Sequence, residues 1–334
     1  MKTLRRLSGV LIVVYLLALT VYLLLRLVFG GGPWWLAMLN NFAPYFFLPA
    51  VIFAPLALAA RLHPRFVLLP LMLLVVGLVW FGPRFAPRPV AAPATATLKV
   101  VTLNLWVSNQ QLDVTETWLR EQAADVVLLQ EAYHDMAARL SDLYPYTLPD
   151  PALPRGQDLQ ILSRYPIIDA DVGSGYLRSV VDVDGTPIAV YNIHFGVPFV
   201  NRPHYGLYAL PYPLSMMVRY NESPRNEQIA NLLARLQAEE TLPAVIAGDF
   251  NTSDNSAMYP VVAGQLTDSF REVATGLGTT WPIGSKLPLA LPLPPLMRID
   301  YVWHTDGLRA LDVQVGPEVG SDHRPVVAVL ALPE

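Results

Sequence analysis

Acidic, amide and imidazole side chains recur at or just past the ends of apolar, strand-like runs in the second part of the chain. Taken singly, each has an ordinary explanation, because Asn and Asp are common turn formers and a strand-final Glu is usually solvated. Strand ends that open onto loops are, however, where α/β folds build sites. The repetition therefore predicts one polar site. Its candidates are Asn104, Glu131, His194, Asp249, Asn251, Asp300, Asp322 and His323.

Two of these residues could help to hold a metal ion. Asn104 and Glu131 offer hard oxygen ligands, which suit Mg²⁺ bound by one or two protein groups, waters and a substrate phosphate. The sequence has no cysteine and no HExxH pair, so a zinc site of the usual type is not indicated.

The remaining chemistry is that of proton transfer. His194 and His323 could donate protons or hydrogen bonds to a phosphoryl oxygen. Asp249 could take a proton from water, and Asp300 could hold a histidine in one tautomer. With a metal, these parts would support hydrolysis of a phosphate ester.

The elements that must position these residues alternate short strands with helices. An apolar stripe of Ile229, Leu232, Leu233 and Leu236 indicates a helix over 223–240, and a second helix is expected over 113–123. Such alternation predicts one α/β domain over 98–334. The expected strands cover 98–106, 125–131, 159–167, 187–195, 242–250, 298–303 and 324–330.

The N-terminal part has a different composition. Residues 1–89 contain eight basic and no acidic residues, whereas the rest carries 15 basic and 27 acidic residues, a net charge of −12. Leu7–Phe29, Phe42–Ala60 and Pro64–Gly82 are apolar runs near the roughly 20 residues that a bilayer requires. We therefore expect a membrane anchor over 1–82 with three transmembrane helices. A cleaved signal peptide fits less well, because the first run is long and two more follow.

Basic residues near these runs predict the orientation. They precede the first run and lie between the second and third, while the loop 30–41 has no charge. This pattern predicts a multi-pass protein of the cell membrane with an extracytoplasmic domain, joined through a Pro/Ala-rich linker over 83–97. Arg84 and Arg88 in that linker oppose the assignment.

Seven short motifs occur in a fixed order over residues 98–332: TLNLW, LLQE, ILSRYPI, NIHF, GDFN, RIDYVW and SDHRP. This set resembles the endonuclease/exonuclease/phosphatase superfamily, which includes DNase I-like nucleases, neutral sphingomyelinases and inositol polyphosphate phosphatases. The resemblance implies a four-layer α/β sandwich of the DNase I-like type. It also implies phosphoester hydrolysis with a divalent cation, Mg²⁺ or Mn²⁺.

The resemblance also implies roles. Asn104, Glu131 and Asp322 would form the metal side of the site, while Asp249 would activate or position water and Asn251 would hold the phosphate. His194 matches a histidine of the DNase I and sphingomyelinase branches. The pair Asp300 and His323 would support the transition state or supply acid and base. The identity of the general base stays open.

Three functions remain open at this stage. The leading hypothesis is a phosphoesterase acting on a lipid or isoprenoid, because a net charge of −12 disfavours nucleic acid, whose phosphates are usually neutralised by Lys and Arg. The architecture also resembles bacterial VanJ-like proteins, which implies a polyprenyl diphosphate. The alternatives are a membrane-tethered extracytoplasmic nuclease and a non-enzymatic membrane-anchored binding module.

Two segments bear on the substrate. Residues 196–220 are rich in aromatic residues, Pro and Met, and residues 282–297 are nearly uncharged. Both flank motif residues, so we expect them to border the site and contact lipid. Packing of both segments on the core of their own domain is the alternative.

Overall fold

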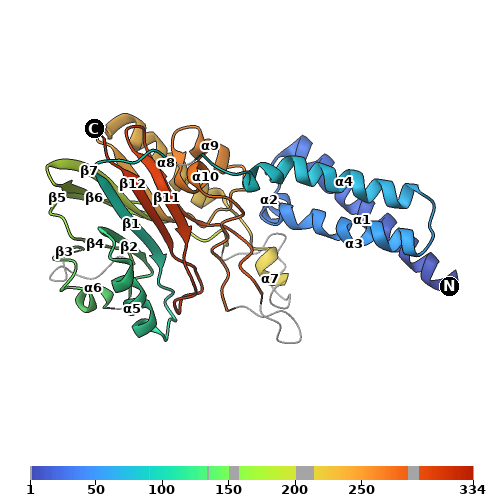
Figure 1. The fold of residues 1–334 in the computed structure, drawn as a ribbon, viewed down its shortest axis with the longest axis horizontal. Coiled ribbons are helices and arrows are strands. Elements are labelled where there is room, and N and C mark those ends of the chain that lie inside the picture. Colours follow the sequence, from blue (N-terminus) through green and yellow to red (C-terminus); the bar gives the residue numbers. More distant parts are fainter. Residues whose placement is uncertain are drawn as a thin grey trace. The chain divides into compact units, whose positions relative to one another are not determined.

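The computed structural model describes residues 2–89, 91–133, 135–149, 158–200, 214–284 and 293–333. The chain divides into two compact units. The helical unit comprises Met1–Ala86, Phe199–Asn221 and Asn255–Ala257, and the sandwich unit comprises Pro87–Pro198, Glu222–Asp254 and Met258–Glu334. Figure 1 shows the elements of both.

The sandwich unit contains two six-stranded sheets. The first has the order β11-β12-β1-β2-β4-β3 and the second the order β5-β6-β7-β8-β10-β9. The pairs β1–β2 and β7–β8 are parallel, and the other pairs are antiparallel. The first sheet is built from β1 (Thr97–Asn104), β2 (Val126–Gln130), β3 (Tyr146–Leu148), β4 (Gln160–Ser163), β11 (Arg309–Val315) and β12 (Val326–Ala331). The second is built from β5 (Ile167–Gly173), β6 (Tyr176–Val183), β7 (Thr186–His194), β8 (Ala244–Asp249), β9 (Thr267–Asp268) and β10 (Asp300–His304).

The period of two along each strand sorts the side chains into layers. In β1, Leu98 and Val100 join the core cluster that also contains Val190 and Val245 of the second sheet, so they face inward. Val101 and Leu103 instead belong to the cluster of α5 (Leu112–Gln122) and α6 (Met136–Arg139). Each sheet therefore has one face on the other sheet and one face under helices.

Helix α8 (Ser223–Glu239) covers the outer face of the second sheet through the predicted stripe of Ile229, Leu232, Leu233 and Leu236, which is buried. Burying a Leu or Ile side chain stabilises the fold by about 1.5–3 kcal/mol, so this stripe fixes the helix on the sheet. The short helices α9 (Tyr259–Ala263) and α10 (Ser269–Val273) complete the unit. The prediction of a four-layer α/β sandwich is confirmed.

One predicted strand is wrong. The segment 159–167 is not continuous, because β4 ends at Ser163 in the first sheet and β5 begins at Ile167 in the second. Between them the backbone N–H of Tyr165 donates to Ser163 Oγ, which closes a turn. Pro166 follows and has no N–H for a ladder. The apolar run thus crosses from one sheet to the other.

The helical unit contains two helices long and apolar enough to cross a membrane, within Arg5–Phe29 and Arg65–Phe85. The predicted second span, Phe42–Ala60, corresponds to the helical stretch Ala43–Ala59, which meets Trp34–Asn40 at a break with an angle of 74°. The number of crossings is therefore two, or three if the bent pair forms one span, and three straight spans are not confirmed. The elements are α1 (Lys2–Phe29), α2 (Trp34–Asn40), η1 (Ala43–Phe47), α3 (Leu48–Ala59), α4 (Arg65–Phe81) and η2 (Gly82–Phe85), with α7 (Leu214–Met217) in the inserted segment.

The break has a chemical cause in two asparagines. Asn40 donates to Gly30 O at 3.0 Å and accepts from Tyr22 Oη at 3.0 Å, while Asn41 donates to the carbonyl of Met38. Pro44 follows in η1 and has no N–H to continue a helix. The α-helical part of the stretch Ala43–Ala59 is α3, with 12 residues and a length of about 18 Å, and η1 leads directly into it.

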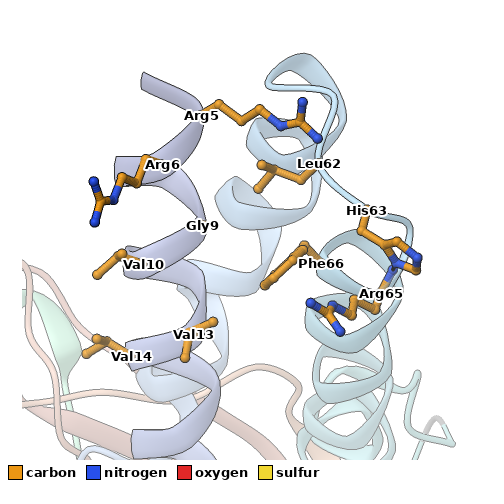
Figure 2. Close-up of a pocket in the computed structure, with 10 residues that line it drawn as sticks. All are labelled: Arg5, Arg6, Gly9, Val10, Val13, Val14, Leu62, His63, Arg65 and Phe66. Atoms are coloured by element: carbon orange, nitrogen blue, oxygen red, sulfur yellow. Dashed lines mark hydrogen bonds between the residues drawn. The ribbon is translucent and has the colours of Figure 1, made fainter. Parts of the chain in front are cut away.

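Helices α1 and α4 lie close to one another at both of their ends. The start of α1 and the α3–α4 turn line one cavity, which Figure 2 shows with Arg5 and Arg65 on facing segments. At the other end, the Arg26 guanidinium lies 4.5 Å from the centre of the Trp80 ring, near the end of α4. Helices α1 and α4 therefore run in the same direction and α3 returns between their ends.

Candidate active site

Three of the predicted site residues form a row across the second sheet. His194 pairs with Asp249 in the β7–β8 register, and Asp249 pairs with Asp300 in the β8–β10 register. All three are in phase with the inward-facing positions of their strands, such as Val190 and Val245. Neighbouring strands lie about 4.8 Å apart, so the register alone brings these side chains together.

Asp249 is the centre of the site. Its Oδ2 accepts from Asn104 Nδ2 and from Asn251 Nδ2, each at 3.2 Å. The same oxygen lies 3.9 Å from His194 Nε2 and 3.9 Å from His323 Nε2. Asn104 ends β1, in phase with the inward-facing Leu98 and Val100, so the two sheets meet at this carboxylate.

Burial dominates the electrostatics of Asp249, which is 1% exposed. Removal from water raises the pKa of its carboxyl to about 6, and the nearby Asp300 adds to the rise. The imidazoles of His323 and His194 act in the opposite direction. A carboxyl with this pKa can exchange a proton near neutral pH.

Asp300 and His323 form a buried pair. His323 Nδ1 lies 3.0 Å from Asp300 Oδ2, which leaves Nε2 directed toward the centre of the site. Burial by itself would lower the pKa of His323, but the carboxylates of Asp300 and Asp249 raise it to about 10. The imidazole is therefore protonated at neutral pH. Ser321 fixes this turn, since its hydroxyl donates to Asn104 O and accepts from the His323 N–H.

A second histidine pair includes a residue that the sequence did not reveal. Asp158 Oδ2 lies 2.5 Å from His194 Nδ1. Burial alone would lower the pKa of His194, but this bond, Asp249 and Glu131 raise it. Asp158 lies two positions before β4, and an acid that precedes a strand was not among the predicted candidates. An acid just before a strand was the signal that could have found it.

Glu131 and Asn251 lie in left-handed backbone conformations, with φ of 48° and 49°. By alternation Glu131 would point outward, one position after the inward-facing Gln130. Its conformation breaks the alternation, and its carboxylate accepts from Asn104 Nδ2 at 3.3 Å and from the Val107 N–H at 2.7 Å. Backbone strain of this kind costs on the order of 1–3 kcal/mol and concentrates at functional sites.

The donor set fits a divalent cation. Asp322 Oδ1 is buried and accepts no hydrogen bond from the part of the chain that the structure describes. Burial raises the pKa of Asp322, and the nearby Glu131 adds a smaller rise. The carboxylate oxygens of Glu131 and Asp322 are ligands that Mg²⁺ and Mn²⁺ accept. Asn104 could add its Oδ1, which in this structure accepts from the Trp106 N–H at 2.9 Å, while its Nδ2 faces Glu131.

A second group of ligand atoms lies nearby. One atom each from Asp249, Asp300 and His323 fall within 4.8 Å of one another. The Nδ1 atom of His323 faces Asp300, and the ring is protonated at neutral pH, so it is a poor metal ligand. The oxygen set around Glu131 is the better candidate. Hydrogen bonds and contacts within 3.9 Å link all eight predicted residues into one cluster centred on Asp249.

A buried amide pair behind the site was also missed by the sequence reasoning. Gln130 Nε2 donates to Asn192 Oδ1 at 2.6 Å, and Asn192 Nδ2 donates to Leu129 O at 2.9 Å and to Gln160 O at 2.8 Å. These bonds tie β2 to β7 next to Glu131 and His194. Amides at inward-facing positions of otherwise apolar strands were the available signal.

Comparison with known proteins identifies the class. The Endonuclease/Exonuclease/phosphatase family matches residues 101–323, so the chain belongs to this family. No curated protein sequence matches it. The fold is similar to that of an endonuclease/exonuclease/phosphatase from Bacteroides vulgatus, at 17% identity, covering 71% of this chain and 100% of that chain with a TM-score of 0.52. A family protein from Bacteroides thetaiotaomicron gives 16% identity, 72% and 99% coverage and a TM-score of 0.52.

Proposed function

We propose that this protein is a membrane-anchored, divalent-metal-dependent phosphoesterase that hydrolyses a phosphate ester or diphosphate of a lipid or isoprenoid. The observation that carries the proposal is the in-register row of His194, Asp249 and Asp300 with a carboxylate partner on each catalytic histidine. Members of the family are phosphoesterase hydrolases, and this row supplies the groups that such chemistry requires.

The metal would be Mg²⁺ or Mn²⁺, held by Asn104, Glu131 and Asp322. When bound, it would neutralise charge on the substrate phosphate. The strained backbone at Glu131 supports this assignment, because the left-handed conformation directs a carboxylate that alternation would otherwise place outside the site.

The residues of the chain divide the proton chemistry. As a water oxygen bonds to phosphorus, its proton passes to Asp249, whose pKa is raised to about 6 by burial. The bond from phosphorus to the leaving oxygen breaks, and protonated His323 donates to the phosphoryl group or to that leaving oxygen. Asp300 orients His323, and Asp158 orients His194, which faces the same centre. Asn251 would hold a phosphate oxygen, as the resemblance implies, although in this structure its Nδ2 donates to Phe195 O at 2.9 Å and to Asp249 Oδ2 at 3.2 Å.

The membrane part of the proposal rests on composition. Two helices are long and apolar enough to span, and the basic residues of 1–65 favour an extracytoplasmic domain over 98–334. The acidic net charge of that domain supports a lipid or isoprenoid, as does the resemblance of the architecture to VanJ-like proteins. The segments 196–220 and 282–297 would border the substrate, although 201–213 and 285–292 lie outside the described residues.

An assay panel tests the substrate. Full-length protein in detergent with Mg²⁺ is offered a phospholipid, a polyprenyl diphosphate and plasmid DNA. Turnover of a lipid or isoprenoid, abolished by EDTA, is the expected result. Nicking of DNA without lipid turnover would favour the tethered nuclease. Absence of all turnover would favour the binding module.

A pair of matched variants and a reporter fusion sharpen this test. Glu131→Gln should lower hydrolysis by several orders of magnitude, while Glu121→Gln, the same change at an exposed helix position, should not. A reporter fused after Glu334 should be active outside the cytoplasm. Activity confined to the cytoplasm would overturn the orientation and leave the hydrolase assignment intact.

A further inference from the structure

A cavity of about 640 Å³ lies at one end of the helical unit, between the start of α1 and the α3–α4 turn. Figure 2 shows its walls, with Arg5 on one segment and Leu62 and Arg65 on the facing one. It belongs entirely to the helical unit and shares no residue with the candidate active site. Its lining residues are Arg5, Arg6, Gly9, Val10, Val13, Val14, Leu62, His63, Arg65 and Phe66.

The cavity carries positive charge that the protein does not balance. Arg5, Arg6 and Arg65 are exposed, and among the described residues their guanidinium groups have no ion pair and no hydrogen bond. The nearest recorded partner is the Phe66 ring, 5.0 Å from the Arg65 guanidinium. Residues 1–89 contain no acidic side chain at all. The counter-charge for these arginines would therefore be an anion from outside the helical unit.

The apolar part of the lining says what kind of anion fits. Val10, Val13 and Val14 follow the arginines along α1, and Phe66 extends from α4 toward α1 (Figure 2). A free phosphate would use the guanidinium groups and leave this apolar wall without a partner. A molecule with a phosphate head and an acyl chain uses both.

We propose that this cavity binds an anionic phospholipid, with its phosphate between Arg5 and Arg65 and an acyl chain along the valines of α1. The proposal rests on the membrane insertion of these helices. Basic pockets between membrane helices bind acidic head groups, and Lys and Arg side chains near an anionic leaflet are attracted to it. The bound lipid would hold α1 against the α3–α4 turn at the predicted cytoplasmic face.

Native mass spectrometry of the full-length protein in a neutral detergent tests this site. Phosphatidylglycerol and phosphatidylcholine with the same acyl chains are added at equal concentration. We expect at least a tenfold preference for retained phosphatidylglycerol in the wild type. The Arg5→Gln/Arg65→Gln variant should lose that preference. Arg61→Gln, the same change at an exposed residue of the same turn outside the lining, should keep it.

Three results would overturn the site: equal retention of both lipids, a preference that survives in Arg5→Gln/Arg65→Gln, or full displacement of the lipid by millimolar inorganic phosphate. Flotation of the same variants with phosphatidylcholine vesicles separates the two proposals. Vesicle binding without lipid preference rejects only the site, whereas failure of the wild type to float rejects membrane insertion.

Discussion

Two buried ionic clusters in the sandwich unit differ in their balance of charge. In the Arg298 cluster, Arg298 lies 2.5 Å from Asp268, and Arg271 lies 2.6 Å from Asp254, so two guanidinium groups meet two carboxylates. In the Asp249 cluster, Asp249, Asp300 and Asp322 gather around the protonated imidazole of His323. The first cluster neutralises itself, and the second retains an excess of acid.

The pKa values of the two central aspartates move in opposite directions. Burial would raise the pKa of Asp268, but Arg298 lowers it below its usual value. Burial raises the pKa of Asp249 to about 6, and the neighbouring histidines do not reverse the rise. Buried charge is balanced by counter-charge in the Arg298 cluster, whereas in the Asp249 cluster it opposes folding, which is the arrangement that the proposed catalytic role would require.

The largest effect is expected at His323. We expect His323→Ala to lower kcat by about 10³-fold or more, because it removes the protonated group that faces the phosphoryl centre. Steady-state kinetics on the substrate found in the panel measures this loss. His304→Ala is the matched control, since His304 is also buried and paired with a carboxylate, Glu272, at 2.9 Å. Equal losses of kcat in the two variants would mean that His323 has only a structural role.

Asp268→Asn should destabilise the fold by about 3–5 kcal/mol, because it leaves Arg298 buried with its main counter-charge removed. Chemical denaturation of the sandwich unit within the full-length protein measures the free energy of unfolding. The expected kcat of the folded fraction is unchanged.

The pH dependence of the free energy of unfolding provides the control for Asp268→Asn. Because the folded pKa of Asp268 lies below the unfolded one, its contribution to stability is complete above about pH 4 and is lost as the pH falls through the folded pKa. Asp268→Asn should therefore lose less stability than the wild type on acidification below pH 4. Parallel acid profiles would contradict the assigned role.

Replacing Asp249 by Asn should change the free energy of unfolding in the opposite direction. With metal chelated at pH 8, Asp249→Asn should stabilise the fold by on the order of 2 kcal/mol, because a carboxylate with a raised pKa opposes folding when ionised. Hydrolysis should be lost at the same time. Thermal unfolding at pH 8 and at pH 5 measures the gain, which should shrink at the lower pH. Destabilisation at pH 8 would place Asp249 with the structural charges.

The smallest effect is expected at Asp158. Asp158→Asn should lower kcat by about 10–100-fold, because it weakens the bond that orients His194. A shift in the pH dependence of kcat distinguishes this positioning role from a loss of stability. Asp169→Asn, at a half-exposed ion pair with Arg178, is the control. An unchanged pH profile in Asp158→Asn would contradict the role.

The sequence predicted the core strands, and it predicted that the polar residues at their ends lie together, because both share one regular signal. Strands β7 and β8 end at a polar residue and β10 begins at one, and the predicted bounds of these three strands coincide with the observed ones within about two residues. Asp249 illustrates the reason, since a carboxylate in phase with buried valines requires a special environment.

The parts that could not be predicted depend on tertiary contacts. Strands β5 and β6 carry charges such as Asp169 and Arg178, which pair with one another across the ladder at 2.8 Å and therefore do not look apolar in sequence. Asp158 acquires its meaning only beside His194, 36 positions away. The break before α3 arises from side-chain bonds of Asn40 and Asn41, which hydropathy does not record.

The in-register row across β7, β8 and β10 also makes the active site a check on folding fidelity. A slip of one position between β8 and β10 would set Tyr301 beside Asp249 and send Asp300 to the helix-covered face. A misregistered sheet could still bury most of its apolar surface, yet it could not assemble the row. Turnover per molecule therefore reports the fraction of chains whose strands have paired correctly.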